Sequence, residues 1–299
     1  MNTAIALFLP LFLGIAIVLL AACILTGSPA RRLFGVLVAC TLTLPPWLTP
    51  PEHSTVRGLW AVIAAMGVVR SIDLLRGEWT LRDRLVHVVS VVDTRKLSPS
   101  TASPGTIAWL LLRCVAWEAL ALGCYLVWCR VPAGSGVGWW LTRWSFALFF
   151  AYTLTEGAYF VLSAGYHLAG FATPPLHIVP AASRSVQEFW GARWNRTVSS
   201  WLGETCFRPL ARRRKPLLGA VAAFSASGVL HAYIAWVAVG GAMAVLSFFY
   251  FFAQSVLMLV EVPLRVRKWQ PVAGHVWAVF WMVLLSPGFT EPMARTLGL

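Results

Sequence analysis

The chain has 299 residues, of which 59% are hydrophobic and only 12% are charged. A typical soluble domain has about 25% charged residues, so the composition excludes a soluble globular enzyme, a disordered tail and a disulfide scaffold. The formal net charge of +13 would suggest nucleic acid binding in a soluble protein, but basic residues also collect on the cytoplasmic side of membrane spans. We therefore predict an all-α polytopic integral membrane protein, with a single membrane domain over 1–299 and no nucleic acid partner.

About eight segments of the sequence are apolar enough to be membrane spans, each of which needs about 20 mostly apolar residues. The second contains Pro45 and Pro46 and is expected to be kinked or cut short, and the eighth is short. The connecting loops are too short to build a core of their own. The predicted spans run approximately over 4–25, 33–48, 58–75, 106–128, 141–162, 217–239, 242–262 and 272–285.

The basic residues are divided unevenly between the two sets of predicted loops. Of the 24 Lys and Arg residues, 18 fall in the loops after the first, third, fifth and seventh spans, and three fall on the opposite side. Because loops rich in Lys and Arg stay in the cytoplasm, both termini are predicted to be non-cytoplasmic. The membrane would be the plasma membrane in a bacterium and the endoplasmic reticulum in a eukaryote.

The predicted loop between the fifth and sixth spans contains an aromatic, amphipathic segment over 183–210. Ser185 and Glu188 form a capping-box pattern, which predicts that a helix starts there. Tryptophans recur at helical spacing after it, as expected for an amphipathic or re-entrant helix on the cytoplasmic side. An interfacial anchor explains the Trp and Arg residues. It explains less well why Gly191 would lie one helical turn before Asn195 on the same face.

His231 is the one ionisable side chain of the sixth predicted span, and Ser227 and Gly228 precede it by one turn. Intramembrane histidines are rare and are functional by default, and a neutral imidazole suits a general base. The alternative is a histidine that forms a hydrogen bond across a helix interface. The other five histidines are expected to be surface or packing residues: His53, His87, His167, His177 and His275.

Several further charges lie within predicted spans. Arg70 and Asp73 are three residues apart and are expected to pair. Arg113, Glu118 and Glu156 also need partners. They are expected to form structural ion pairs or to line a polar tunnel, and the sequence does not choose between these roles.

Two motifs in this region resemble those of a known family. The segment SVQEFWGARWN, residues 185–195, resembles the FWG-x-x-W-[NH] signature of wax-synthase-like membrane-bound O-acyltransferases. The segment SGVLH, residues 227–231, is similar to their SG-x-x-H segment, which holds the catalytic histidine. The aromatic run that leads to Gln254 and Glu261 is similar to the next block of that group. The resemblance is specific over about 183–262, the predicted catalytic core.

The resemblance implies acyl transfer from acyl-CoA to the hydroxyl of a lipophilic alcohol, as in wax-ester synthesis. It implies His231 as the general base and Asn195 as its catalytic partner, with no metal and no cofactor beyond acyl-CoA as co-substrate. Membrane lipid is expected as a further partner. The basic loop over 193–215 suits a polyanionic CoA head group, although each arginine there could equally serve topology or anionic lipid. The substrate-binding residues it implies are Trp190, Gly191, Arg193, Trp194, Ser227, Gly228 and Glu261.

Other functions fit parts of the sequence. Within the family, the acceptor could be a terpenoid, polyketide or sugar hydroxyl with a short acyl donor. A proton-coupled transporter would use His231 as a relay, but the sequence shows no twofold internal symmetry of the kind many transporters have. An intramembrane prenyltransferase needs Asp-rich pairs to hold Mg²⁺, and the chain has eleven acidic residues and no such motif. A non-catalytic scaffold would tolerate replacement of His231 by glutamine.

Overall fold

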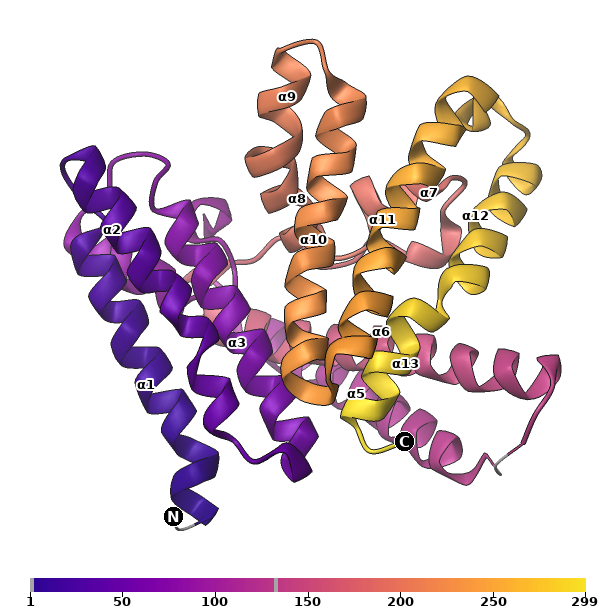
Figure 1. Ribbon diagram of the computed structural model, residues 1–299, viewed down its shortest axis with the longest axis horizontal. Helices are drawn as coiled ribbons and strands as arrows, with labels where there is room; N and C mark the ends of the chain where they lie inside the picture. Colours follow the sequence, from indigo (N-terminus) through magenta and orange to yellow (C-terminus); the bar gives the residue numbers. More distant parts are fainter. Residues whose placement is uncertain (1–2, 132–133) are drawn as a thin grey trace. The chain divides into compact units, whose positions relative to one another are not determined.

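The computed structural model describes residues 3–131 and 134–299, and within these ranges the regular structure is helical apart from one pair of two-residue strands (Figure 1). Contacts divide the chain into two compact units. Unit 1 comprises Met1–Lys96, Leu230–Ala244 and Arg295–Leu299, and unit 2 comprises Leu97–Val229 and Val245–Ala294. The prediction of an all-α polytopic membrane protein is confirmed, whereas the single domain over 1–299 stays a prediction.

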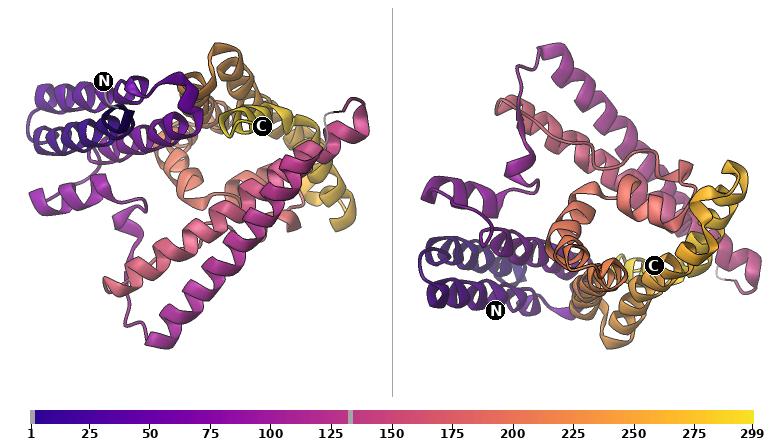
Figure 2. Two further views of the ribbon diagram at one scale, coloured as in Figure 1. Left: turned by 90° about the horizontal axis from the view of Figure 1, so that it is seen from below. Right: turned by 90° about the horizontal axis from the view of Figure 1, so that it is seen from above.

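Unit 1 is built around three helices that lie side by side, α1 (Thr3–Ile24), α2 (Pro29–Cys40) and α3 (Ser54–Asp73) (Figure 2). Ser28 caps α2 by accepting the Arg31 N–H at 3.4 Å, and Pro29 occupies the first helical position, where its missing N–H costs nothing. Small side chains let the helices approach closely. Their shared core contains Val18, Ala21, Ala22, Leu25, Ala39, Leu42, Ala64, Leu74 and Val88.

The second predicted span, 33–48, is not a continuous helix. α2 ends at Cys40, and two 3₁₀ turns follow, Thr41–Thr43 and Pro45–Leu48. Pro45 and Pro46 cannot donate the backbone N–H that an α-helix requires, so the expectation of an interruption is confirmed. The prediction of a helical second span is wrong.

A buried ionic network closes the end of α3 against α4 (Leu81–Val89). Asp73 is fully buried and lies 3.1 Å from Arg70 Nη1, so the predicted pair is confirmed. The same carboxylate also lies 3.3 Å from Arg76 and 3.2 Å from Arg95, and His87 Nε2 is 3.5 Å away. His87 is itself fully buried. Three arginines thus pair with the buried Asp73 carboxylate, as a buried charge requires.

Asp93, at the edge of this network, is expected to make stability depend on pH at the acidic end. Burial raises the pKa of Asp93, but hydrogen bonds and charge from Arg95, with Lys96 nearby, outweigh burial and bring it from 3.8 to about 2. A carboxyl whose pKa is lower in the folded state stabilises that state at any pH above its pKa in the unfolded state. This stabilisation is lost as the pH falls through the pKa of the folded state. The stability difference between wild type and Asp93→Asn should therefore be constant from pH 5 to 7.

Thermal unfolding of both proteins in detergent checks this expectation. The difference should shrink as the pH falls from about 4 to about 2. A difference that stays constant down to pH 2 would contradict it.

Unit 2 contains a long helical hairpin, α5 (Pro104–Arg130) and α6 (Val137–Leu168). The two helices pack closely at Gly157 of α6, where an added Cβ would collide with the Glu118 carboxylate of α5. Arg113 places its guanidinium 4.1 Å from the centre of the Phe160 ring. Glu118 therefore faces α6, whereas Arg113 contacts an aromatic ring of α6 but is itself exposed. β1 (Ser98–Pro99) pairs antiparallel with β2 (Phe171–Ala172).

Six helices of the described chain are long and apolar enough to cross a membrane, which indicates an integral membrane protein. A seventh span would be the bent pair α12 (Pro271–Leu285) and α13 (Pro287–Thr296), which meet at 44°. The predicted count of about eight is therefore too high, because the second segment is interrupted and the eighth is bent. The remaining helices are α7 (Val186–Glu188), α8 (Arg196–Leu202), α9 (Arg208–Arg212), α10 (Pro216–Val239) and α11 (Gly241–Leu264).

Candidate active site

The predicted amphipathic helix after Ser185 is broken in the middle. α7 runs into a π-helical turn, Phe189–Arg193, and Trp194 is extended. The backbone on both sides of this break bonds to residues 176–178: Ile178 N–H donates to Arg193 O at 2.9 Å, and Arg196 N–H to Leu176 O at 2.8 Å. These bonds replace the helical ones, so the expectation of one continuous helix is wrong. π-helical turns are rare and frequent at functional sites.

Asn195 is the residue at which the chain re-enters a helix. It adopts the left-handed conformation, with φ 35° and ψ 63°, and its Oδ1 accepts the Val198 N–H at 3.2 Å to cap α8. Asparagine tolerates this conformation better than most residues do. Its Nδ2 donates to no group among the described residues, so the amide hydrogens stay available for a ligand.

Gly191 does not share a helical face with Asn195, because the helix breaks between them. Gly191 is exposed, and an added Cβ would meet nothing within 4 Å. The expectation that Gly191 lies one turn before Asn195 on one face is therefore wrong. A role for Gly191 beside a substrate remains a prediction.

Asn195 caps α8, and the family resemblance also predicts a catalytic role for it; Asn195→Asp is expected to distinguish the two. Aspartate can still accept the Val198 N–H and cap α8, since Asp and Asn are comparable caps, but it has no amide hydrogens to donate. We expect unchanged thermal stability. If the amide donates to an oxyanion in acyl transfer, as the family resemblance implies, activity should fall about 10²- to 10³-fold, the effect of losing one such donor. Asn195→Ala should lose stability as well, by about 1 kcal/mol. Full activity in Asn195→Asp would limit Asn195 to a capping role.

Ser185 starts α7 as predicted, since its Oγ accepts the Glu188 N–H at 2.9 Å. Glu188 reaches back to the Arg184 N–H at 2.8 Å and also binds Arg193 at 2.7 Å. Burial raises the pKa of Glu188, but these hydrogen bonds and the arginine charges lower it below its ordinary value. Arg193 also donates to the carbonyl of Ile178 at 3.1 Å. Arg193 thus has protein partners, and its predicted contact with substrate stays a prediction.

Trp190 lies in an aromatic cluster formed with α10 and α11. Its Nε1 donates to Gln254 Oε1 at 3.1 Å, and Gln254 is fully buried. The centre of its ring lies 5.9 Å from that of Phe224, 6.3 Å from Tyr250 and 5.7 Å from Phe251. The structure therefore brings the first motif beside the aromatic run of α11, with a tryptophan anchored by a buried amide.

The sequence did not identify His177 as a site residue. It is 8% exposed, its Nδ1 lies 3.1 Å from Glu156 Oε1, and the centres of its ring and that of Trp194 are 4.6 Å apart. Trp194 also stacks on Phe189 at 5.5 Å. Glu156 of α6 therefore positions His177, and His177 packs against Trp194, the residue before Asn195. The only sequence signal was Glu156 within a span, which needs a partner without saying which.

Removing the Glu156 carboxylate is expected to loosen this stack. Glu156→Ala leaves the buried His177 without its acceptor, and we expect a stability loss of about 1–3 kcal/mol. Glu156→Gln keeps an acceptor oxygen and should lose less. Thermal unfolding in detergent measures both variants. If Glu156→Ala is as stable as wild type, the pair does not hold the segment before Asn195.

Glu261 belongs to α11, and its carboxylate lies at the N-terminal end of α7. Its carboxylate accepts the N–H groups of Val186 at 2.7 Å and Gln187 at 3.0 Å, and the Trp277 Nε1–H at 2.9 Å. The side chain is 4% exposed. Glu261 therefore caps α7 from another helix, and its predicted contact with substrate stays a prediction.

α10 carries the second motif. Gly228 is buried, and a Cβ there would lie 3.1 Å from the Phe248 ring and 3.2 Å from its carbonyl oxygen, so glycine lets α10 approach α11. Ser227 is 5% exposed, and His231 is half-buried. His231 belongs to unit 1 and Asn195 to unit 2, so their approach to one another remains a prediction.

Two comparisons with known proteins bear on the sequence around these motifs. Residues 173–253 match the membrane bound O-acyl transferase family. A protein of Arabidopsis thaliana, "Probable long-chain-alcohol O-fatty-acyltransferase 2", is 30% identical over 177 residues, which are 52% of this chain and 50% of that protein. The chain thus spans about half the length of this curated relative. The stretch matched by the membrane bound O-acyl transferase family, residues 173–253, contains both Asn195 and His231.

Proposed function

We propose that this protein is an O-acyltransferase that moves an acyl group from acyl-CoA to the hydroxyl of a lipophilic alcohol, as in wax-ester synthesis. The observation that carries the proposal is the family match over 173–253, which contains both motifs in order. The similarity to a protein named as a long-chain-alcohol O-fatty-acyltransferase supports an alcohol as the acceptor and a fatty acyl chain as the group transferred.

In the proposed reaction, His231 acts as the general base. Its neutral imidazole accepts the proton of the alcohol while the alcohol oxygen attacks the thioester carbonyl carbon. The tetrahedral intermediate then collapses: the carbon–sulfur bond breaks, and the imidazolium returns the proton to the departing CoA thiolate. The products are the ester and free CoA thiol, and no acyl-enzyme is needed.

Asn195 would stabilise the oxyanion of that intermediate. A donor aimed at developing negative charge favours the transition state more than the ground state. The cap on α8 uses only Oδ1 of Asn195 and leaves Nδ2 free of partners in the described structure. The cap on α8 and the packing of Trp194 against His177 and Phe189 would hold this amide in place.

The CoA phosphates would bind the exposed basic residues that follow α8. Arg193 and Arg196 already donate to backbone carbonyls, whereas Arg208 and the run from Arg212 to Lys215 are exposed. This assignment places the acyl-CoA head group on the predicted cytoplasmic side, with both termini on the other side.

An acyl-transfer assay on the purified full chain tests the proposal. Acetyl-CoA and palmitoyl-CoA are each supplied with long-chain, terpenoid and sugar alcohols, and thiol release is measured together with ester formation. Ester from palmitoyl-CoA and a long-chain alcohol is the expected result. A preference for acetyl-CoA would instead assign the protein as an acetyltransferase. Absence of both thiol release and acyl-CoA binding, with proton-coupled uptake in proteoliposomes, would overturn the proposal in favour of a transporter.

A further inference from the structure

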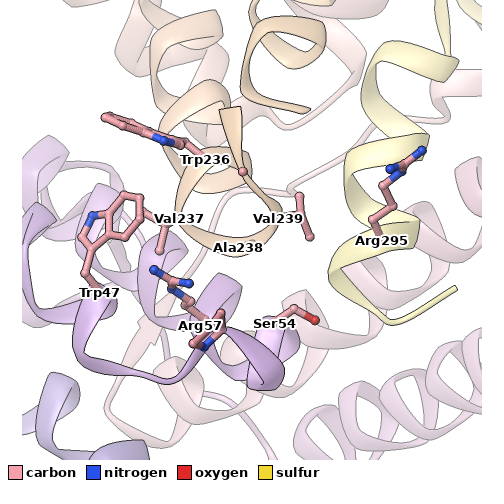
Figure 3. Close-up of a pocket in the computed structure, with 10 residues that line it drawn as sticks. Trp47, Ser54, Arg57, Trp236, Val237, Ala238, Val239 and Arg295 are labelled. Carbon is pink, nitrogen blue, oxygen red and sulfur yellow. The ribbon is translucent and has the colours of Figure 1, made fainter. Parts of the chain in front are cut away.

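A cavity of about 570 Å³ lies within unit 1, and none of the residues that line it belongs to the motifs described above. Its wall is formed by the last turn of α10, the first turn of α3, the 3₁₀ turns Pro45–Leu48 and Pro51–His53, and Arg295 of α13 (Figure 3). The volume is in the range of small-molecule sites. Ten residues line it: Trp47, Pro51, Ser54, Arg57, Trp236, Val237, Ala238, Val239, Gly240 and Arg295.

The cavity is basic and has no acidic counterpart in its lining. Arg57 and Arg295 are its charged residues, and neither side chain forms a hydrogen bond or ion pair among the described residues. The Nε atom of Arg57 is buried without an acceptor. Glu52 is exposed and is not one of the lining residues. A buried guanidinium donor without an acceptor is unfavourable, and an oxyanion ligand would supply the acceptor.

Two tryptophans give the cavity an apolar, aromatic side. Trp47 and Trp236 meet edge to face with ring centres 5.3 Å apart, and the Arg57 guanidinium lies 4.7 Å from the centre of the Trp47 ring. Figure 3 shows these three side chains gathered on one side of the cavity. Trp236 lies in the last turn of the apolar helix α10, a position at which tryptophans meet lipid head groups, and Trp47 lies in the 3₁₀ turn Pro45–Leu48. The wall thus suits a molecule with an anionic head and an apolar body.

Hydrogen bonds hold the segments around the cavity in place. Ser54 and Thr55 donate to the carbonyl of Thr296, at 3.0 Å and 2.8 Å, and thereby fix the residue next to Arg295 against α3. Tyr233 donates to the carbonyl of Thr43 at 3.1 Å and ties α10 to the turn before Trp47. The cavity is therefore preformed rather than dependent on a ligand for its shape.

We propose that this cavity binds the phosphate head group of an anionic membrane phospholipid. The two arginines would bind phosphate oxygens, for which the planar guanidinium is suited, and the tryptophans would pack on the glycerol and the first methylene groups. The uncompensated double positive charge favours a lipid of net negative charge over a zwitterionic one. The proposal does not depend on the acyl-transfer reaction.

Lipid binding to the purified full chain tests this proposal, with native mass spectrometry as the readout. Phosphatidylglycerol, phosphatidylcholine and diacylglycerol are offered at equal concentration. The expected order of retention is phosphatidylglycerol first and diacylglycerol last, because diacylglycerol has no phosphate. Equal retention of diacylglycerol and phosphatidylglycerol would overturn the proposal. If inorganic phosphate binds as tightly as phosphatidylglycerol, the ligand of the cavity is a free anion and the lipid proposal is overturned.

Variants assign the binding to the cavity. Arg57→Gln should weaken phosphatidylglycerol binding at least tenfold, and Arg57→Lys, which keeps the charge without the planar fork, should weaken it less. Arg295 is exposed, so Arg295→Gln provides a variant with little risk to folding and is also expected to weaken binding. Arg130→Gln removes an exposed arginine outside the cavity and should change nothing. Wild-type binding in folded Arg57→Gln and Arg295→Gln would overturn the proposal.

Discussion

Replacing His231 with glutamine is expected to reduce acyl transfer about 10²- to 10⁴-fold, the usual contribution of a general base. Glutamine is similar in size to histidine and can still form hydrogen bonds, but it cannot accept a proton at neutral pH. Folding and membrane insertion should therefore be unchanged. Ester formation and thiol release from acyl-CoA are measured in detergent at equal protein concentration.

The matched control for His231 is His53, which lies in the turn before α3 and whose side chain forms no hydrogen bond or ion pair among the described residues. His53→Gln should retain full activity. Undiminished turnover in His231→Gln would show that His231 is not the general base. An equal loss of activity in both variants would indicate a general effect of replacing histidine by glutamine. Loss of activity together with a lower unfolding temperature in His231→Gln would point to a packing role instead.

Replacing Glu261 with alanine is expected to give the largest loss of stability. The change leaves the N–H groups of Val186 and Gln187 and the indole N–H of Trp277 without their acceptor. An unsatisfied buried donor costs about 1–3 kcal/mol, so we expect a loss of about 3 kcal/mol or more in the free energy of unfolding. Activity should fall too, since α7 leads into the π-helical turn before Asn195.

Two further variants make the Glu261 prediction specific. Glu261→Gln keeps one acceptor oxygen and should lose less stability than Glu261→Ala. Glu78 is exposed, so Glu78→Ala should leave the unfolding temperature unchanged. Thermal unfolding in detergent and the acyl-transfer assay are measured on each variant. Normal stability with lost activity in Glu261→Ala would show that the carboxylate contacts substrate, as the family resemblance implied.

Features that depend on neighbours in the chain were predictable from the sequence alone. The apolar segments predicted membrane helices, Pro45 and Pro46 predicted the interruption after α2, and the spacing of Arg70 and Asp73 predicted their pair. Ser185 caps α7 as its capping pattern indicated. Each of these features rests on contacts within about one helical turn, where residue type and spacing decide the outcome.

Tertiary structure decided the arrangement of the candidate site. The aromatic segment has a pattern typical of one amphipathic helix, yet backbone bonds to residues 176–178 break it at Trp194 and leave Asn195 as a cap. Glu156 and His177 are 21 residues apart, and Glu261 is 75 residues from the Val186 N–H that it accepts. These groups satisfy one another only after folding brings distant segments together. Local helical propensity is worth less than the hydrogen bonds that buried groups would otherwise lose.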